Sequence, residues 1–153
     1  MPPETRWFDD FKPGDVAEFG DRVVTEAEII AFATDYDPQP FHIDPVAARS
    51  SVFGHLVASG WHTGSLVMRL MVDHFITPES FMGSPGFDEL RWTRPVLPGD
   101  RLHVRVTVLQ SVPSRSKPDR GVVHSLTETF NQHGDVVMTM RGMVMVRRRP
   151  VED

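Results

Sequence analysis

The sequence contains no cysteine. A chain without thiols forms no disulfide, no thiolate nucleophile and no cysteine-ligated zinc site, and it suits the cytoplasm, where we expect this protein. No apolar run approaches the ~20 residues of a membrane-spanning helix, so we expect no membrane insertion. The first residues, Met1 to Glu4, lack the basic and apolar regions of a signal peptide. Basic residues do not predominate either: the formal net charge is -5, which argues against a nucleic-acid partner.

The composition is that of an ordinary globular protein, with 40% hydrophobic and 24% charged residues in a chain of 153. Such a length buries roughly two thirds of the unfolded surface around one core. We therefore expect a single domain over residues 1–153. Residues 1–10 read as an N-terminal arm, anchored by the aromatic side chains of Trp7 and Phe8.

The first half of the chain predicts one strand followed by helices. The strand is expected at 16–24, and Thr25 with Glu28 has the spacing of a capping box that starts a short helix. The longest helix is predicted at 61–75. Most of its circumference is apolar, so it should be largely surrounded by other structure. Its narrow polar stripe consists of His62, Ser65, Arg69 and Asp73.

In the second half the period changes to two, which predicts antiparallel strands. They are expected at 87–94, 101–109, 122–130 and 136–146. In the last strand the apolar parity slips at Gly142, which predicts a β-bulge there. A strand, short helices, one long helix and a run of strands predict an α+β fold. A strongly curved antiparallel sheet wrapped around the long central helix would explain the apolar surface of that helix.

An acid and a base lie five positions apart in the stretch Asp37-Pro38-Gln39-Pro40-Phe41-His42. Its prolines fix φ and bias the residues before them away from the helical region, which stiffens the loop. Histidine titrates near neutrality, and burial can raise an aspartate towards the same range. The pair is a candidate for general acid–base catalysis. The alternative is a proline-rich surface loop that merely contains two titratable side chains.

A second stretch, Val57-Ala58-Ser59-Gly60-Trp61, leads into the long helix. A helix N-terminus presents free N–H donors with partial positive charge, and small residues let other groups approach it closely. Such a site can receive the oxyanion that develops on the carbonyl of an acyl thioester. The alternative is an ordinary helix start, with Ser59 as the cap and Gly60 for tight packing.

Together these stretches resemble a known family. Residues 37–42 look like the Asp-x-Asn-Pro-aliphatic-His signature of the MaoC-like dehydratases, a group that includes the (R)-specific enoyl-CoA hydratases. Residues 53–61 resemble the segment that enters the central helix of that family. Residues 90–100 are similar to its strand, Arg-Pro-Val motif and Gly-Asp turn. The resemblance extends from about Phe11 to Arg147, which is nearly the whole chain.

The resemblance implies a hot-dog fold and a homodimer or higher homo-oligomer in which the sheets of two chains join. It also implies an acyl-CoA substrate whose pantetheine lies in a tunnel near the dimer interface. Asp37 and His42 match the catalytic pair of the family, and Gly60 matches the glycine whose N–H helps to bind the thioester oxygen. The remaining candidates for substrate binding are Ser59, Trp61 and Phe41.

Two positions depart from the family pattern. Gln39 replaces the usual asparagine, which leaves both titrating groups in place but changes the residue that shapes the turn. A serine that supports the catalytic aspartate in some hydratases would fall near Met68, which has no hydroxyl. Either Ser65 or Thr63 substitutes for it, or the aspartate is tuned differently.

The charged residues of the 112–121 loop have more than one interpretation. Arg115, Lys117 and Arg120 in the 112–121 loop either meet CoA phosphates or form a solvated hairpin tip. We expect no metal and no cofactor, because His55, His62 and His74 lack a convincing ligand arrangement.

The leading functional hypothesis is reversible hydration of an enoyl-CoA. An acyl-CoA thioesterase on the same fold is a second possibility, and Asp73 is the only acid in the long helix that could aim water at a carbonyl carbon. A third is a non-catalytic module that binds an acyl thioester.

Overall fold

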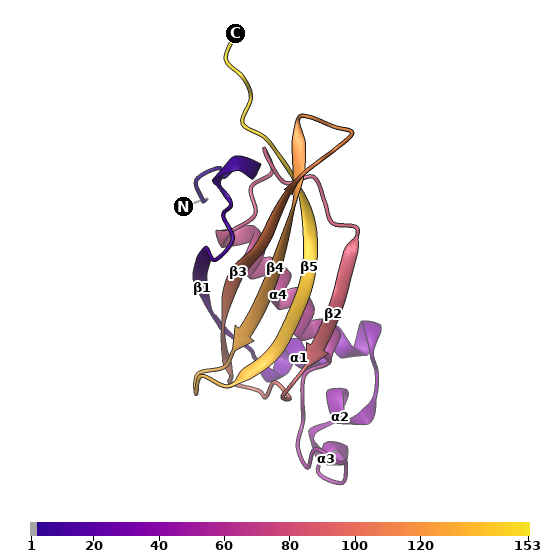
Figure 1. Ribbon diagram of the computed structural model, residues 1–153. Coiled ribbons are helices and arrows are strands. Elements are labelled where there is room, and N and C mark those ends of the chain that lie inside the picture. The colour runs from indigo at the N-terminus through magenta and orange to yellow at the C-terminus, as the bar shows by residue number, and fades with distance from the viewer. Residues whose placement is uncertain (1–2) are drawn as a thin grey trace.

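The computed structural model describes residues 3–153, so the first two residues of the predicted arm lie outside the described residues. The elements follow one another along the chain as Figure 1 shows. They are η1 (Phe8–Asp10), β1 (Val16–Val23), α1 (Glu26–Tyr36), α2 (Pro40–Ile43), α3 (Pro45–Ala48), α4 (Gly60–His74), β2 (Gly86–Trp92), β3 (Arg101–Pro113), β4 (Arg120–Phe130) and β5 (Val136–Arg147). The predicted long helix and strands are all present. Strand β3 continues to Pro113 instead of ending at residue 109.

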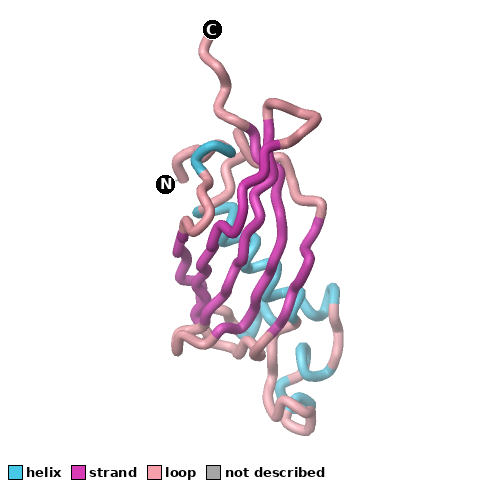
Figure 2. Tube along the Cα trace, in the orientation of Figure 1, coloured by secondary structure: helices cyan, strands magenta, loops and turns pink. Residues whose placement is uncertain are grey.

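Within residues 3–153, five strands form one antiparallel sheet in the order β1-β3-β4-β5-β2. The sheet curves around α4, and Figure 2 shows this helix lying across one face of it. Helices α2 and α3 lie beyond one end of the sheet, near the end of β2, whereas the hairpin between β3 and β4 projects from the opposite end (Figure 1). This arrangement confirms the predicted α+β fold.

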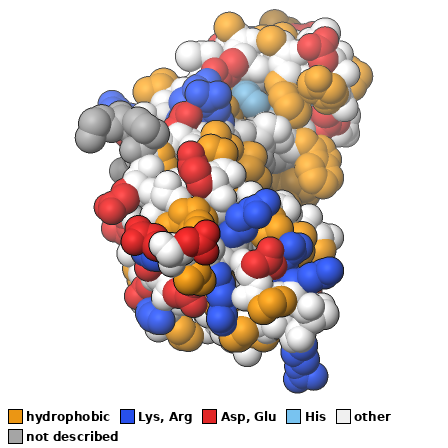
Figure 3. Space-filling model, turned by 90° about the horizontal axis from the view of Figure 1, so that it is seen from above, with side chains coloured by type: hydrophobic (Ala, Val, Ile, Leu, Met, Phe, Trp, Pro, Cys, Tyr) orange, Lys and Arg blue, Asp and Glu red, His pale blue; other side chains and the backbone are white. Residues whose placement is uncertain are grey.

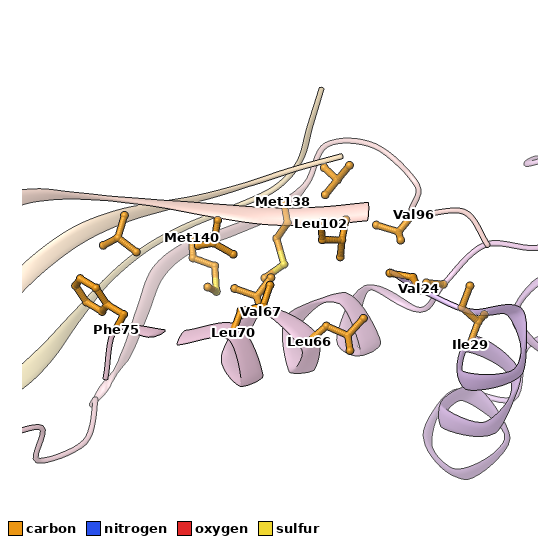
Figure 4. Packing of buried hydrophobic residues seen from close by; sticks show 14 of the residues in the cluster. Val24, Ile29, Leu66, Val67, Leu70, Phe75, Val96, Leu102, Met138 and Met140 are labelled. Atoms are coloured by element: carbon orange, nitrogen blue, oxygen red, sulfur yellow. The ribbon is translucent and has the colours of Figure 1, made fainter. Parts of the chain in front are cut away.

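The core lies between α4 and the sheet. Leu66, Val67 and Leu70 of the helix face Met138 and Met140 of β5, as Figure 4 shows. Val67 is completely buried. Fully burying one such aliphatic side chain contributes about 1.5–3 kcal/mol, so this layer fixes the helix against the sheet and thereby the position of its N-terminus.

Helix α4 is less enclosed than its sequence predicts. Trp61, Met68 and Val72 are 62%, 44% and 48% exposed, and all three belong to one side of the helix. His62, which the sequence assigns to the polar stripe, is instead 4% exposed. Its ring stacks on Phe32 of α1 at a centroid distance of 4.9 Å. The single chain therefore leaves one apolar face of α4 open and uses His62 to pack α4 against α1.

The predicted bulge at Gly142 is wrong. β5 pairs with β4 in unbroken register on both sides of this glycine. The irregularity lies in the neighbouring strand β2, where Phe87 pairs with Gly142 and Glu89 with Arg141, leaving Asp88 as the extra residue. A Cβ at position 142 would come within 2.4 Å of the Phe87 ring, so the glycine provides the space for that ring.

The sequence misleads here because both parities after the glycine are apolar. Val146 is fully buried and Val144 packs against the core, so the inward face continues without a slip. Met143 and Met145 are only half-buried.

None of the helices within residues 3–153 combines the length and apolar character needed to cross a bilayer.

Candidate active site

Asp37 is placed by the end of α1, and His42 by a separate turn of helix. Asp37 is the C-cap of α1, and its N–H donates to the carbonyl of Ala33. The stretch that the sequence predicts as a stiff loop closes into α2, with Pro40 at the first helical turn, where a missing N–H costs nothing. This turn directs His42 inward, and the residue is 6% exposed.

Asp37 and His42 meet, with 3.3 Å between Oδ2 of the carboxylate and Nε2 of the ring. The other ring nitrogen, Nδ1, lies 2.6 Å from the carbonyl oxygen of Val57. A carbonyl only accepts hydrogen bonds, so Nδ1 carries a proton and donates it. In the neutral ring the lone pair is then on Nε2, facing Asp37.

The Asp37 carboxylate accepts two further hydrogen bonds. Ser59 Oγ donates to Oδ2 at 2.7 Å, and Gln39 Nε2 donates to Oδ1 at 2.6 Å. Burial raises the pKa of the Asp37 carboxyl, but the bonds from Gln39 and Ser59 and the adjacent His42 ring outweigh it and leave this pKa below its ordinary value. Asp37 is therefore an anion at neutral pH.

These contacts account for both departures from the family pattern. Gln39 occupies the position of the usual asparagine and reaches the carboxylate itself. The hydroxyl beside the aspartate comes from Ser59, at the start of α4, and not from Ser65 or Thr63. Ser65 Oγ donates to the carbonyl of Trp61.

Ser59 does not act as the predicted side-chain cap of the helix. It occupies the N-cap position of α4, but in the described part of the chain its side chain makes no capping hydrogen bond. Its hydroxyl is used by Asp37 instead. Ser59 is fully buried, and this places it behind the carboxylate.

A cavity of about 300 Å³ opens beside His42. It lies between α2, the first turn of α4 and the segment that follows β2. His42 and Gly60 both line it. Phe41 forms part of the wall, with its ring edge against the His42 ring at a centroid distance of 4.5 Å. Three residues proposed from the sequence, His42, Gly60 and Phe41, therefore line one cavity. Asp37 does not line it but contacts His42, which does.

Trp92, at the end of β2, covers the start of α4. Its Nε1 donates to the carbonyl of Gly60 at 2.9 Å. A Cβ at position 60 would lie 2.3 Å from the indole, so only glycine fits beneath it. Trp61 is 62% exposed and meets the Trp92 ring edge-on at 5.1 Å. Trp61 thus supports the cavity wall from outside, and Trp92, which the sequence did not single out, forms that wall.

The remaining charged candidates lie elsewhere. The β3–β4 hairpin tip, which carries Arg115 and Lys117, is at the end of the sheet opposite α2 (Figure 1). Seen from above in Figure 3, acidic and basic side chains are interspersed over that end. Asp73 pairs with Arg69 at 2.9 Å near the C-terminal end of α4. At 1.5 Å per residue it is about 20 Å from Gly60 along the helix.

No group of three or more potential metal ligands occurs within residues 3–153. His62 faces the interior between α1 and α4, where burial lowers the pKa of its ring.

Comparison with known proteins places this geometry in a family. Residues 10–129 match the family described as MaoC like domain. The chain belongs to the MaoC-like dehydratase family. The crystal structure of the MaoC-like dehydratase from Rhodospirillum rubrum superposes on this MaoC-like chain with a TM-score of 0.90 at 44% identity, covering 96% of this chain and all of that one (100%).

Two further structures support the fold. The R-hydratase PhaJ1 from Pseudomonas aeruginosa superposes with a TM-score of 0.73 at 26% identity, over 96% of this chain and 92% of that one. A protein of Mycobacterium tuberculosis with a double hot-dog fold gives a TM-score of 0.79 at 15% identity, over 97% of this chain and 46% of that one. The predicted hot-dog fold is confirmed.

Among proteins compared by sequence, the 3-hydroxybutyryl-CoA dehydratase of Methylorubrum extorquens is 25% identical over 100% of this chain and 93% of its own length. Protein MaoC of Klebsiella aerogenes is 36% identical over 69% of this chain, and the match spans 31% of that protein. Mesaconyl-CoA hydratase of Cereibacter sphaeroides is 41% identical over 42% of this chain and 18% of its own length. The chain thus corresponds to only a part of the last two proteins.

Proposed function

We propose that this protein reversibly hydrates the 2,3 double bond of a trans-2-enoyl thioester, with an enoyl-CoA as substrate. The observation that carries the proposal is the contact between Asp37 and His42 beside the cavity, with the His42 tautomer fixed by the carbonyl of Val57. The relatives named R-hydratase and 3-hydroxybutyryl-CoA dehydratase support the same chemistry.

In the proposed reaction, Asp37 and His42 together hold one water molecule. The Asp37 carboxylate and the Nε2 lone pair of His42 are both acceptors, and water supplies two O–H donors. As the water oxygen adds to C3 of the substrate, Nε2 takes its proton, because Asp37 with its lowered pKa is the weaker base. Asp37 stabilises the imidazolium that forms, and the same proton is returned to C2. Dehydration is the reverse sequence.

Charge that develops on the thioester oxygen requires donors. Gly60 is the first residue of α4, so its N–H is one of the helix N–H groups without an intrahelical acceptor, and the residue lines the cavity. We assign this N–H as the oxyanion donor. Removing one such donor typically costs about 3–4 kcal/mol of transition-state stabilisation, or roughly 10²–10³ in rate.

Two substitutions test the acid–base assignment. Asp37→Asn and His42→Gln keep the size of each side chain, and we expect each to lower kcat for crotonyl-CoA by at least about a hundredfold. Circular dichroism should show that both variants remain folded. Near-normal hydration by either variant would rule out the pair as the catalytic groups.

The two other functions make different predictions. A thioesterase would release free CoA, which a thiol reagent detects, but Asp73 lies at the far end of α4 from the cavity and is paired with Arg69. A binding module would be stabilised against heat by acyl-CoA without any turnover. We expect hydration without release of thiol.

A second copy of the chain completes this proposal. Strand β2 forms an edge of the sheet, and Phe87 on it is 50% exposed. Met68, on the open face of α4, lines the same hollow as Phe87, and Val72 on that face is exposed as well. An edge strand beside an apolar surface favours pairing with another chain. We propose a homodimer in which β2 pairs with its copy.

A further inference from the structure

Thr63, near the start of α4, carries a hydroxyl without a partner in the described chain. The residue lines the cavity together with His42 and Gly60, and it is 2% exposed. Its Oγ1 takes part in none of the side-chain hydrogen bonds within residues 3–153, whereas the hydroxyls of Ser59 and Ser65 on either side both do. Buried polar groups normally have a partner, so an unpaired hydroxyl at a cavity indicates a polar group of a ligand.

The helix itself does not use this hydroxyl. A threonine or serine inside a helix can donate to the carbonyl four residues earlier. Thr34 and Ser65 do so, at 2.7 and 2.8 Å. In the described chain Thr63 makes no such bond, and the carbonyl of Ser59 accepts its backbone N–H instead.

The other polar side chains on the cavity wall each have a partner in the described chain. They are His42, Trp92, Thr93 and Arg94. Thr93 carries the second hydroxyl of the wall, and its Oγ1 donates to the carbonyl of Val136 at 2.6 Å. Among the described residues, Thr63 therefore brings the one unpaired hydroxyl to this cavity.

The oxygen of Thr63 is the part of the side chain that stays open. The fully enclosed side-chain polar atoms of the described chain that lack a partner are Glu28 Oε1, His62 Nδ1, Thr129 Oγ1 and Arg148 Nε. Thr63 Oγ1 also lacks a partner but is not one of these enclosed atoms. The small surface that Thr63 keeps therefore includes its oxygen, and the residue lines the cavity.

The hydroxyl belongs to the same side of α4 as Gly60. Residues three positions apart are neighbours on a helix surface, about 5–6 Å apart. Helix side chains lean towards the N-terminus, which carries the Thr63 hydroxyl towards the N–H of Gly60. A carbonyl oxygen has two lone pairs and can accept from both donors at once.

We infer that Thr63 is a second oxyanion donor, whose hydroxyl donates a hydrogen bond to the thioester oxygen beside the Gly60 N–H. This inference rests on the proposed function, which places the thioester oxygen at Gly60. The proton stays on Oγ1 throughout, so water still supplies the OH at C3 and the proton at C2. The bond strengthens as negative charge develops on the oxygen, and its loss lowers kcat more than it raises KM.

Thr63→Val should lower kcat for crotonyl-CoA by at least about tenfold with little change in KM, because a hydrogen bond to a charged acceptor is worth at least that factor. Thr63→Ser, which keeps the hydroxyl, should retain most of the activity. Thr129→Val is the matched control, since it also removes a buried, unpaired hydroxyl, but from β4 and away from the cavity wall. It should leave kcat unchanged, and thermal melting checks that both valine variants stay folded.

Two results would overturn the inference. One is a fall in kcat of less than about tenfold in Thr63→Val, which is smaller than the loss of a charge-assisted hydrogen bond. The other is an equal fall in Thr63→Ser, which would assign the effect to the methyl group and its packing.

A saturated ligand keeps this inference apart from the hydratase proposal. Butyryl-CoA labelled with ¹³C at the thioester carbonyl binds without a double bond to hydrate, and a hydrogen bond to its oxygen lowers the C=O stretching frequency. Infrared difference spectra of the bound ligand should show this band at higher wavenumber in Thr63→Val than in the parent protein or Thr63→Ser.

If the band shifts but no enoyl-CoA is hydrated, the hydratase proposal fails and the Thr63 contact stands. If crotonyl-CoA is hydrated and Thr63→Val changes neither the band nor kcat, the hydratase proposal stands and the role of Thr63 is wrong.

Discussion

At the scale of single residues, the site depends on what each polar atom of Asp37 and His42 faces. Both ring nitrogens of His42 are directed at acceptors, and both oxygens of Asp37 accept from uncharged donors. The carboxylate therefore stays ionised, and in the proposed hydration the ring exchanges the proton. In this proposal the division of roles between the two groups comes from their hydrogen bonds.

Ser59→Ala should move the titration of the Asp37 carboxyl, followed by NMR at its carboxyl carbon, to higher pH. The change removes a donor to Asp37 and so raises the pKa of the carboxyl towards its ordinary value. Ser59→Thr, which keeps the hydroxyl, should restore the titration seen in the parent protein. Ser65→Ala is the control, since its hydroxyl bonds to the carbonyl of Trp61. An Asp37 titration that Ser59→Ala leaves in place would contradict this role.

The same lowered pKa predicts how Asp37 affects stability. A carboxyl whose folded-state pKa lies below its unfolded value, about 3.9, stabilises the fold fully above that value, and the stabilisation is lost as the pH falls through the folded-state pKa. Asp37→Asn should therefore reduce the free energy of unfolding, measured with urea, at pH 7 more than at pH 3. An equal reduction at both pH values would show that this carboxyl contributes no linkage.

At the scale of elements, the start of α4 is where packing and chemistry meet. The carbonyl of Gly60 is held by Trp92, its N–H is the proposed oxyanion donor, and the preceding residue holds Asp37. The core layer behind α4 fixes this end of the helix. A helix that was free to shift along its axis would move all three contacts at once.

Gly60→Ala should destabilise the protein and lower its activity, because the added Cβ would lie 2.3 Å from the Trp92 indole and displace it. Gly64→Ala, one turn later in the same helix, is the control. Its Cβ would meet Met138 at an ordinary 3.6 Å, so this change should be neutral or stabilising by up to about 1 kcal/mol. Thermal melting and crotonyl-CoA turnover measure both effects, and equal melting temperatures for the two variants would refute the close approach of Trp92.

The elements were predictable from sequence where the pattern was local. Alternation in β3 gave its buried face, with Leu102 and Val104 completely buried, because strand periodicity depends on neighbours two residues apart. The partner of Ser59 lies 22 residues away, and no local pattern indicates such a contact. For the same reason His62 was assigned to a polar stripe, whereas a contact with Phe32 on another helix buries it.

At the scale of the whole molecule, one apolar side of the described chain is not covered by other structure. Part of the apolar surface of α4 is exposed in the single chain, namely Trp61, Met68 and Val72. Trp61 and Met68 lie beside the edge strand β2. The expectation that α4 is surrounded becomes consistent with the fold if a second copy covers this face. Sequence periodicity reports that a face is apolar, but not whether the same chain or another one covers it.

Met68→Glu should convert the proposed dimer to a monomer, because it places a charge on the open face of α4. Leu109→Glu is the matched control: Leu109 is 42% exposed, close to the 44% of Met68, but it lies on β3. Light scattering should give the mass of one chain for the first variant and of two chains for the second. Two chains in both variants would remove this face from the interface.

The hydrogen bond between His42 and the main chain of Val57 has a consequence for how such a site can change in evolution. The main chain of Val57 accepts from the His42 ring through its carbonyl and donates to the carbonyl of Phe41 through its N–H, at 3.0 Å. The side chain of residue 57 takes no part in either bond, and the residue lines the cavity. Mutations at this position can reshape the wall while Nδ1 of His42 keeps its proton, as the proposed hydration requires. Selection can therefore alter which substrates the cavity accepts without changing the hydrogen bonds that hold His42.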